Sequence, residues 1–208
     1  MADQTKERII EAASRTLVRR GYHETSMKDI AAEAGVAPGL AHYYFASKED
    51  LLVAAIEHAC QPLMEAYEAA GMSVSGPLPE DADPMSFARM GFEFAKQELK
   101  SYPGVFVLTF DMFGVGLHNP NIAAAVRAFI DERRGFVARI SQGVIAGMGE
   151  PPVSSVAAIA AAIWGSLHGI ALQKAMDPEF DSDAAIDALS EMAIAFATRP
   201  ATRPGKEG

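Results

Sequence analysis

Three neighbouring side chains near residue 43 are able to bind nucleic acid. His42, Tyr43 and Tyr44 can each donate a hydrogen bond to a phosphate oxygen or to an acceptor on a base edge. Leu40 and Ala41 precede them, and small apolar side chains of this kind suit contact with the methyl group of thymine. The segment therefore combines polar and apolar groups that a DNA-binding element uses.

Two serines mark the starts of the helices that must position this segment. Ser26 and Ser47 each stand three residues before an aspartate, in the pattern Ser-x-x-Asp. In such a pattern the serine oxygen accepts a hydrogen bond from an amide of the first turn, and the positive end of the helix dipole favours the acid. We therefore expect helices to begin near residues 27 and 48.

A further short helix is expected between these two. Gly35 suits the left-handed residue that follows a helix ending at Ala34, and Pro38 suits a first helical turn, where its missing N–H has no partner to lose. Residues 27–34 and 38–44 then form a helix, a three-residue turn and a second helix, which is the spacing of a helix-turn-helix motif. The second helix of that motif lies in the major groove of DNA.

Several polar side chains beside the motif are candidates for phosphate contacts. Lys48 stands in a first helical turn, where a cation is unfavourable for the helix dipole but well placed to meet an anion. The predicted DNA-binding residues are Thr25, Ser26, Lys28, Leu40, Ala41, His42, Tyr43, Tyr44 and Lys48. The alternatives are that the tyrosines pack in a core and that the serine acts only as a cap. Helix-turn-helix geometry also occurs in proteins that do not bind DNA.

Short motifs follow one another in a fixed order over residues 5–52. They are Arg20-Gly21-Tyr22, Thr25-Ser26, Ile30-Ala31, Ala34-Gly35-Val36, Gly39, Tyr44-Phe45 and Ser47-Lys48-Glu49. In order and spacing they resemble the N-terminal DNA-binding domain of the TetR family of transcriptional regulators. The resemblance implies a homodimer that represses transcription, in which each subunit has a three-helix DNA-binding region and a larger helical bundle that binds a small molecule.

The resemblance also indicates which positions contact DNA. By position, the residues that resemble DNA-contacting ones are Thr25, His42, Tyr43, Tyr44 and Lys48. Leu40 stands where a hydroxyl residue is frequent in the family, and Ala41 where a larger apolar residue is frequent. These two departures leave the base contacts, and hence the operator sequence, open.

Composition limits the kind of protein this can be. Half of the 208 residues are hydrophobic and 22% are charged, which is typical of a folded globular chain. The net charge is -9, so we expect any nucleic-acid site to be local rather than spread over the surface. The single Cys60 excludes a disulfide within the chain, and the charged first ten residues do not form a secretory signal. We therefore expect a cytoplasmic protein.

Helical periodicity predicts an all-α fold. An amphipathic helix ends at Gly21, and beyond the motif we expect helices at about 84–100, 103–113, 120–147, 154–176 and 183–197. The predicted organisation is a DNA-binding domain over residues 1–47, a ligand-binding and dimerisation domain over 48–198, and a disordered tail over 199–208.

Two apolar stripes on the last two predicted helices suggest a dimer. Small and apolar residues recur at helical spacing and permit close packing of four helices about a twofold axis. The predicted dimer-interface residues are Ala161, Gly165, Gly169, Ala185, Leu189, Met192 and Phe196. The alternative is that these stripes pack within one subunit. Residues 151–173 carry no charge and are long enough to cross a bilayer, but their many Ala, Ser and Gly residues favour a buried helix of a soluble protein.

A group of aromatic residues in the same region suggests an apolar cavity for an effector. The predicted effector-binding residues are Phe94, Phe110, Phe113, Phe129, Arg133, Phe136, Trp164 and His168. Core packing explains the aromatic residues as well. Arg133 lies on an apolar helix face and needs an anion, which is either an acid of the chain, with Asp111 and Glu93 as candidates, or a carboxylate or phosphate of the effector.

Catalytic motifs are missing from the sequence. The segment GSLHG at 165–169 is not a nucleophile elbow, and Gly114-Val115-Gly116 lacks the third glycine of a dinucleotide-binding loop. No His-Glu-x-x-His occurs, and the five histidines are scattered, so we expect no metal site and no cofactor. We expect a regulator rather than an enzyme. The remaining alternative is a helical small-molecule-binding or interaction protein without DNA activity.

Overall fold

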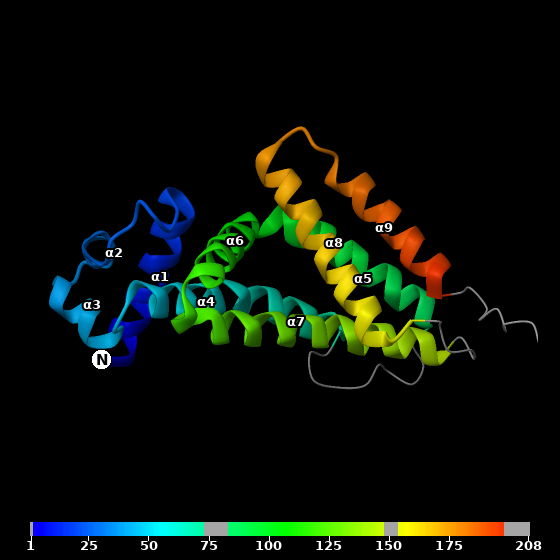
Figure 1. Cartoon of the computed structure of the whole chain (residues 1–208), viewed down its shortest axis with the longest axis horizontal. Coiled ribbons are helices and arrows are strands. Elements are labelled where there is room, and N and C mark those ends of the chain that lie inside the picture. The colour runs from blue at the N-terminus through cyan, green and yellow to red at the C-terminus, as the bar shows by residue number, and fades with distance from the viewer. Residues whose placement is uncertain (1, 73–82, 148–153, 198–208) are drawn as a thin grey trace, which may run out of the picture. The chain divides into compact units, whose positions relative to one another are not determined.

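The computed structural model describes residues 2–72, 83–147 and 154–197, which fold into helices joined by short connections (Figure 1). Over these residues no strand occurs, and the expected all-α fold is confirmed. The helices are α1 (Ala2–Arg20), α2 (Met27–Glu33), α3 (Pro38–Tyr44), α4 (Lys48–Ala69), α5 (Pro84–Ser101), α6 (Pro103–His118), α7 (Pro120–Gly147), α8 (Val156–Met176) and α9 (Ser182–Ala197).

The capping signals define the helix starts as expected. The Ser26 hydroxyl accepts from the amide of Asp29 at 3.2 Å, and the Asp29 carboxylate accepts from the amide of Ser26 at 2.9 Å, which completes a capping box. At the start of α4 the Ser47 hydroxyl accepts from the amide of Asp50 at 3.1 Å. The predicted helix starts near 27, 38 and 48 are therefore confirmed.

Helix α6 continues beyond its predicted end at residue 113 and reaches His118. Gly114 and Gly116 lower the helix propensity of this last part. However, Gly116 approaches Val126 so closely that a Cβ on Gly116 would lie 2.6 Å from the Val126 Cγ2 atom. Close packing against α7 thus requires a glycine here, and such tertiary contacts override local propensity.

The chain forms two compact units. Unit 1 comprises Met1–Ala66 and Tyr102–Ile130, and unit 2 comprises Tyr67–Ser101 and Asp131–Gly208. Helices α4 and α7 contribute residues to both units. The predicted DNA-binding domain lies wholly within unit 1, together with most of α4, α6 and the first part of α7. The functional boundary after residue 47 remains a prediction, and the predicted tail over 199–208 lies outside the described residues.

Unit 1 has a hydrophobic core built around α1. Helix α1 packs against α2, α3 and α6. Full burial of one Leu or Ile side chain stabilises a fold by about 1.5–3 kcal/mol. The larger side chains of this core with no exposed surface are Ile9, Leu17, Ile30, Leu51, Leu52, Ile56, Leu108 and Met112. The helix-turn-helix is therefore fixed to α4 and α6 by apolar packing and does not stand alone.

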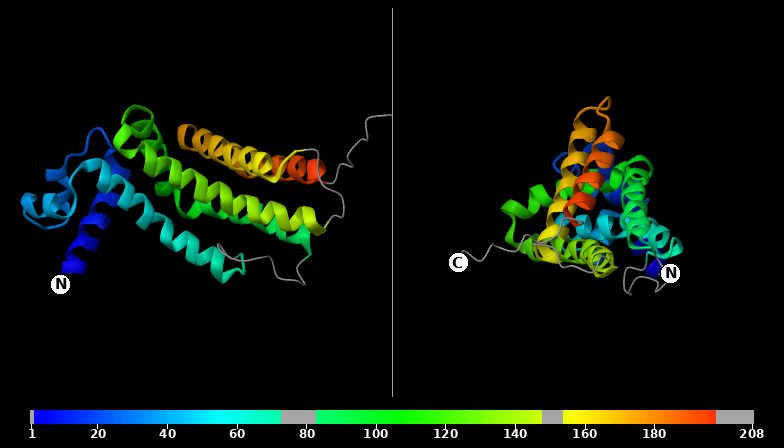
Figure 2. Two further views of the ribbon diagram at one scale, coloured as in Figure 1. Left: turned by 60° about the horizontal axis from the view of Figure 1, so that its bottom comes forward. Right: turned by 90° about the vertical axis from the view of Figure 1, so that its right-hand side faces the viewer.

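Unit 2 contains α5, α8 and α9, and α9 lies alongside both of the others (Figure 2). Its smaller core includes Phe92, Ile170, Ile186 and Leu189. Ion pairs add to the contact between α5 and α9, because Lys96 bridges Glu93 and Asp187 at 2.8 and 2.5 Å. The charged faces of α5 and α9 thus meet beside the apolar core of unit 2.

Helix α8 differs from the expectation of a buried helix. By length and composition α8 is apolar enough to cross a membrane, and only 17% of its most apolar stretch is buried in the single chain. The expected burial is therefore wrong for one isolated subunit. A run of apolar residues predicts that a surface becomes covered, but not which molecule covers it.

The turn between α2 and α3 provides a stability prediction. Gly35 has a φ of +65°, in the left-handed region where a Cβ is strained, whereas Gly39 lies inside α3 with open space around it. We expect Gly35→Ala to lower the free energy of unfolding by about 1 kcal/mol or more. The matched control Gly39→Ala should raise it by roughly 0.5–1 kcal/mol, since alanine is the better helix former. Urea unfolding followed by circular dichroism measures both, and equal effects of the two substitutions would contradict this account of the turn.

Candidate functional site

Helix α3 presents side chains to solvent on one side and is anchored on the other. Tyr43 is 79% exposed and Leu40 is 37% exposed, and His42 is also exposed. Ala41 has no exposed surface, and Phe45 just after the helix is buried. Pro38 stands at the first position of α3 as expected. The helix is therefore held by its inner face while His42 and Tyr43 point away from the core.

Two of the predicted DNA-binding residues, Thr25 and Ala41, have buried side chains. Thr25 is 2% exposed, and its hydroxyl donates to the carbonyl of Gly21 at 2.8 Å. The Ala41 side chain lies on the buried inner face of α3 and has no surface open to a thymine methyl group. Both positions lie next to exposed ones in the sequence. Which face of such a short helix is buried depends on how the helix packs against α1. Residue types alone do not reveal that packing.

Tyr44 and Ser26 have mixed environments. Tyr44 is half-buried, packs against the core of unit 1, and meets Tyr43 edge-on with ring centroids 5.2 Å apart. Ser26 is exposed, and its hydroxyl is engaged by the capping box with Asp29. Lys28 is exposed on α2. Of these three, Lys28 is the side chain most open to a phosphate.

Lys48 holds the connection between α1 and α2. Its ammonium donates to the carbonyls of Tyr22 and Thr25 at 2.7 and 2.8 Å, and it lies 3.9 Å from the centre of the Tyr22 ring. Burial lowers the pKa of Lys48, while the carboxylates of Glu49 and Asp111 raise it. Two backbone carbonyls and the face of the Tyr22 ring thus already contact the Lys48 ammonium. These contacts give Lys48 a role in positioning the helix-turn-helix.

Tyr22 connects the same region to α4 and α6. Its hydroxyl donates to Glu49 at 2.8 Å, and its amide donates to Asp111 at 2.8 Å. Burial raises the pKa of the Tyr22 hydroxyl, and its bond to Glu49 raises it further. Asn119 donates to the same Glu49 carboxylate at 3.3 Å. We call Tyr22, Lys48, Glu49 and Asp111 the Tyr22 cluster.

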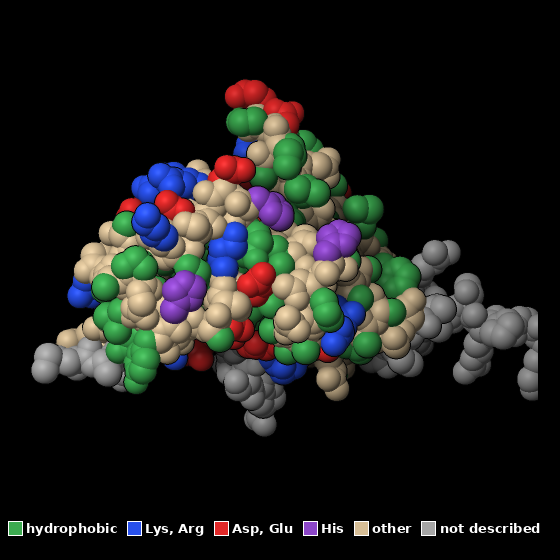
Figure 3. Space-filling model, turned by 60° about the vertical axis from the view of Figure 1, so that its left-hand side comes forward, with side chains coloured by type: hydrophobic (Ala, Val, Ile, Leu, Met, Phe, Trp, Pro, Cys, Tyr) green, Lys and Arg blue, Asp and Glu red, His purple; other side chains and the backbone are tan. Residues whose placement is uncertain are grey.

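The basic residues near the motif are balanced by acids. Arg15 and Arg19 both contact Glu33 at 3.4 Å, and Arg20 contacts Asp29 at 3.4 Å. Figure 3 shows Lys and Arg side chains in small separate groups with acidic side chains beside them. Such pairs contribute little to stability at an exposed surface. A phosphate group is able to compete for the arginines, because their ion pairs are open to solvent.

The sequence comparison agrees with this geometry. Residues 9–55 match the family described as bacterial regulatory proteins, tetR family. This segment belongs to the TetR family. It covers α1 beyond its first turns, the whole helix-turn-helix, and the start of α4, so the TetR-type domain includes both α3 and the Tyr22 cluster residues 22, 48 and 49.

Curated relatives match part of the chain. The HTH-type transcriptional regulator BetI of Brucella suis biovar 1 (strain 1330) is 31% identical over 97 residues, which are 47% of this chain and 49% of the relative. BetI of Agrobacterium fabrum is 40% identical over 72 residues, or 35% of each chain. The chain thus spans between a third and a half of the length of these relatives.

Solved structures share the fold over nearly the whole chain. The transcriptional regulator FadR from Bacillus subtilis, in complex with stearoyl-CoA, has a TM-score of 0.70 and 19% identity, with 91% of this chain and 97% of that chain covered. A TetR transcription regulator from Haloarcula marismortui gives 0.70 and 18%, with 94% and 97% covered. At this identity the similarity shows a common fold for the part that follows the TetR-type domain.

The predicted effector residues divide between the two units. In unit 1, Phe113 and Phe129 meet with ring centroids 6.5 Å apart and pack against the core of the TetR-type domain. Phe110, also in unit 1, is partly buried. In unit 2, the rings of Trp164 and His168 are tilted by 34° with centroids 3.9 Å apart, and the His168 Nδ1 atom donates to the Trp164 carbonyl at 3.0 Å. Burial lowers the pKa of His168.

The remaining predicted residues meet around a tyrosine that the sequence analysis missed. The Tyr67 ring stacks on Phe94 with centroids 5.2 Å apart and meets Phe136 edge-on at 4.9 Å. The Tyr67 hydroxyl donates to Glu98 at 3.3 Å. Burial raises the pKa of the Glu98 carboxyl to about 7, although the Tyr67 hydroxyl and the Arg133 guanidinium both lower it.

The positive charge of Arg133 thus lowers the pKa of the Glu98 carboxyl. The Nε atom of Arg133 is buried, and its guanidinium also lowers the pKa of the Tyr67 hydroxyl. Of the two acids considered from the sequence, Glu93 is bound by Lys96, and Asp111 accepts from Tyr22 in unit 1. Glu98 follows Phe94 by four residues, which puts both on one helix face, and this spacing is the signal that could have identified it.

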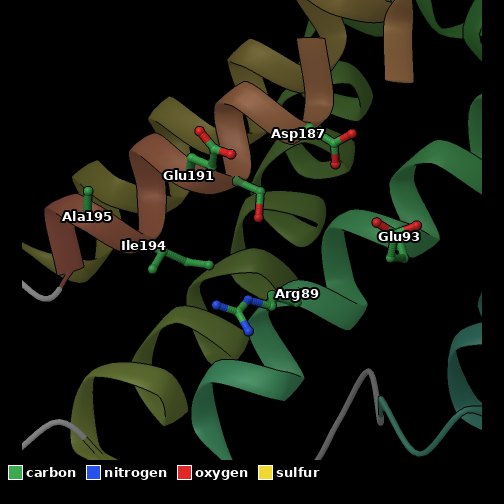
Figure 4. A pocket seen from close by; sticks show the side chains of 7 residues that line it. Arg89, Glu93, Asp187, Glu191, Ile194 and Ala195 are labelled. Atoms are coloured by element: carbon green, nitrogen blue, oxygen red, sulfur yellow. The ribbon is translucent and has the colours of Figure 1, made fainter. Parts of the chain in front are cut away.

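An open groove lies between α5 and α9 and is separate from these residues. It has a volume of about 420 Å³ and is lined by Arg89, Glu93, Asp187, Ser190, Glu191, Ile194 and Ala195. Figure 4 shows the Arg89 side chain extending toward α9, where Ile194 lies. Over the described residues no cluster of three or more potential metal ligands occurs. The groove is charged and differs from the apolar pocket predicted for an effector.

The predicted dimer residues are mostly accessible in the single chain. Met192 is 62% exposed and Phe196 is 41% exposed on α9, and Gly165 and Gly169 are exposed on α8. Ala161 and Ala185 are partly buried, whereas Leu189 is 9% exposed and belongs to the core of unit 2. An apolar surface of this kind extends over both helices, because Leu172 and Met176 are exposed as well.

The Tyr22 cluster gives a prediction with a pH dependence. Tyr22→Phe removes the hydroxyl that donates to Glu49, and we expect the free energy of unfolding to fall by about 1–2 kcal/mol at pH 7. The Tyr22 hydroxyl is the main cause that lowers the pKa of Glu49 in the folded protein. The bond therefore stabilises the fold at pH values above the pKa of the Glu49 carboxyl in the unfolded chain, and this stabilisation is lost as Glu49 becomes protonated. The difference from the wild type should therefore shrink as the pH falls below about 4.

Thermal unfolding at a series of pH values measures this effect. Tyr43→Phe is the matched control, because the Tyr43 side chain is exposed and its hydroxyl should contribute little. A loss of stability that is the same in both variants, or that does not change with pH, would show that the bond from Tyr22 to Glu49 is unimportant.

Proposed function

We propose that this chain is a DNA-binding regulator of transcription that acts as a homodimer in the cytoplasm. The observation that carries the proposal is the exposed face of α3, where Leu40, His42 and Tyr43 project from a helix that is anchored by buried neighbours. The match of residues 9–55 to the TetR family supports the same function. In this role α3 enters the major groove, while Lys28 and the flanking residues contact phosphates.

A dimer suits this function for a physical reason. One helix of seven residues has few side chains for base contacts, and two half-sites about one DNA turn apart multiply the affinity. The apolar surface formed by α8 and α9 provides a place where two copies can meet. Its exposed residues include large apolar side chains whose burial favours association, namely Leu172, Met176, Met192 and Phe196.

Repression and release by an effector are the finer part of the proposal. Helix α4 begins within the Tyr22 cluster and continues to Ala69, beyond Tyr67 of the aromatic group in unit 2. A small, largely apolar effector that binds one arrangement of unit 2 more tightly shifts α4, and hence the hold of Lys48 and Glu49 on the helix-turn-helix. A coupling of about 1–3 kcal/mol is enough for a useful switch.

The DNA-binding role is tested by a mobility-shift assay at stated salt, with DNA that flanks the protein's own gene. We expect Tyr43→Ala and His42→Ala each to weaken specific binding by about tenfold or more, because each side chain lies on the exposed face of α3. Leu117→Ala is the matched control, since Leu117 is 81% exposed on α6 in the same unit. Unchanged affinity in both α3 variants would reject this surface, and absence of any DNA binding would favour a small-molecule-binding or interaction protein.

The dimer interface is tested by sedimentation at micromolar concentration. The wild type should be a dimer, and Met192→Glu and Phe196→Glu should each give a monomer, because a charge in an apolar interface is expensive to desolvate. Leu117→Glu places the same charge on an exposed apolar position of α6 and should remain a dimer. A wild-type monomer, or dimers in all three variants, would show that α9 does not form the interface.

A further inference from the structure

We propose that Arg8 and Lys6 of α1, which lie outside the helix-turn-helix motif, form a clamp for the phosphate backbone of DNA, with one cation at each end of α3. This inference rests on the proposed DNA-binding function and names two contacts that the sequence analysis did not predict. Arg8, Lys6 and α3 all belong to unit 1, in which α1 packs against both α2 and α3.

The Arg8 side chain lies against the turn that precedes α3. Its Nη2 atom donates to the carbonyl of Ala34 at 2.6 Å, and a Cβ on Gly35 would lie 3.5 Å from the same atom. Ala34 is the C-cap of α2, where the negative end of the helix dipole favours a cation. A guanidinium carries five N–H donors, so one bond to a carbonyl leaves donors for a second acceptor. Arg8 is exposed, so the carbonyl holds the guanidinium without enclosing it.

The Lys6 side chain lies at the other end of α3. Its Nζ atom is 5.9 Å from the centre of the Phe45 ring, and Phe45 is the C-cap of α3. The ring attracts the ammonium through its quadrupole but takes up none of its three N–H donors as a conventional acceptor would. Lys6 is exposed, so these donors are open to a phosphate oxygen.

The acids nearest in the sequence do not neutralise these two charges. Over the residues that the structure describes, no ion pair involves Arg8 or Lys6. Glu11 instead lies 3.7 Å from Arg15. Glu7 stands between the two basic residues in the sequence, but successive residues of a helix point about 100° apart. A phosphate therefore meets two cations that no carboxylate already binds.

The spacing of the two cations fits the major groove of DNA. Helix α3 has seven residues and is therefore about 10 Å long, so Arg8 and Lys6 lie at the ends of a rod of roughly that length. The major groove is about 12 Å wide and is bordered by the phosphates of both strands. When the exposed face of α3 enters the groove, Arg8 and Lys6 contact phosphates while Leu40 and Tyr43 contact base edges.

Lys48 is less suited to the same task. Two of its three N–H donors are directed at the carbonyls of Tyr22 and Thr25, and its ammonium also lies over the Tyr22 ring. Arg8, in contrast, gives one bond to a carbonyl and remains exposed. The geometry thus moves the main phosphate contact from the start of α4 to α1.

The test is the salt dependence of DNA binding by the full chain. Each phosphate contact releases counterions, so the logarithm of the binding constant falls with the logarithm of the salt concentration by about 0.9 per contact. Fluorescence anisotropy gives this slope for a labelled duplex that flanks the protein's own gene and for a random duplex of equal length. Arg8→Met and Lys6→Gln should each reduce the slope by about 0.9 per subunit, and each should weaken both duplexes by the same factor.

Matched variants separate a phosphate contact from a structural role. Arg8→Lys keeps the charge and should keep the slope. Arg127→Gln removes a charge from an exposed position of α7 in the same unit and should change neither slope nor affinity. Tyr43→Ala should weaken the flanking duplex more than the random one, because base contacts depend on sequence. Lys6→Gln breaks no hydrogen bond among the described residues, so it keeps the test valid if Arg8→Met does not fold.

An unchanged slope in both the Arg8→Met and Lys6→Gln variants, with DNA binding by the wild type, would overturn the clamp alone. A loss of affinity in Arg8→Met without a change in slope would show that Arg8 serves only to hold the turn before α3. A wild type that binds neither duplex would reject both the clamp and the proposed regulator. Equal affinity of the wild type for the two duplexes, with reduced slopes in the variants, would reject a sequence-specific regulator while the clamp stands.

Discussion

The placement of α3 depends on how the Tyr22 cluster satisfies polar groups between α1 and α2. The Lys48 ammonium is shared by two backbone carbonyls, while Tyr22 donates to Glu49 from its side chain and to Asp111 from its backbone. Without these partners, partly buried polar groups would be left unsatisfied beside the core. The same contacts join the helix-turn-helix to α4 and α6. The cluster therefore positions α3, and a shift of α4 or α6 would move α3 through it.

Much of the fold could be predicted from the sequence because its signals are local. Ser26 with Asp29, Ser47 with Asp50, and Pro38 define three helix starts through hydrogen bonds or a dihedral angle within one turn. The extension of α6 to His118 could not be predicted, since it depends on the contact of Gly116 with Val126 in α7.

The candidate sites were predicted less completely, because the burial of their residues also depends on contacts between segments distant in sequence. Residue type suggested Tyr43 and Lys28, which are exposed, but did not show that Thr25 and Ala41 are buried. Glu98 resembled an ordinary surface acid, because its partial burial beside Tyr67 is created by packing between helices distant in sequence. The aromatic residues predicted as one cavity belong to two compact units, a division that periodicity does not reveal.

Hydrogen–deuterium exchange of the full chain with and without DNA that flanks its own gene tests the central claim most directly. The account predicts that bound DNA slows exchange in a peptide covering residues 38–46, since α3 is short and then becomes enclosed by the groove. Exchange in a peptide covering residues 182–196 should stay the same. Slowed exchange in the second peptide without any change in the first would contradict the assignment of α3 as the helix that binds DNA.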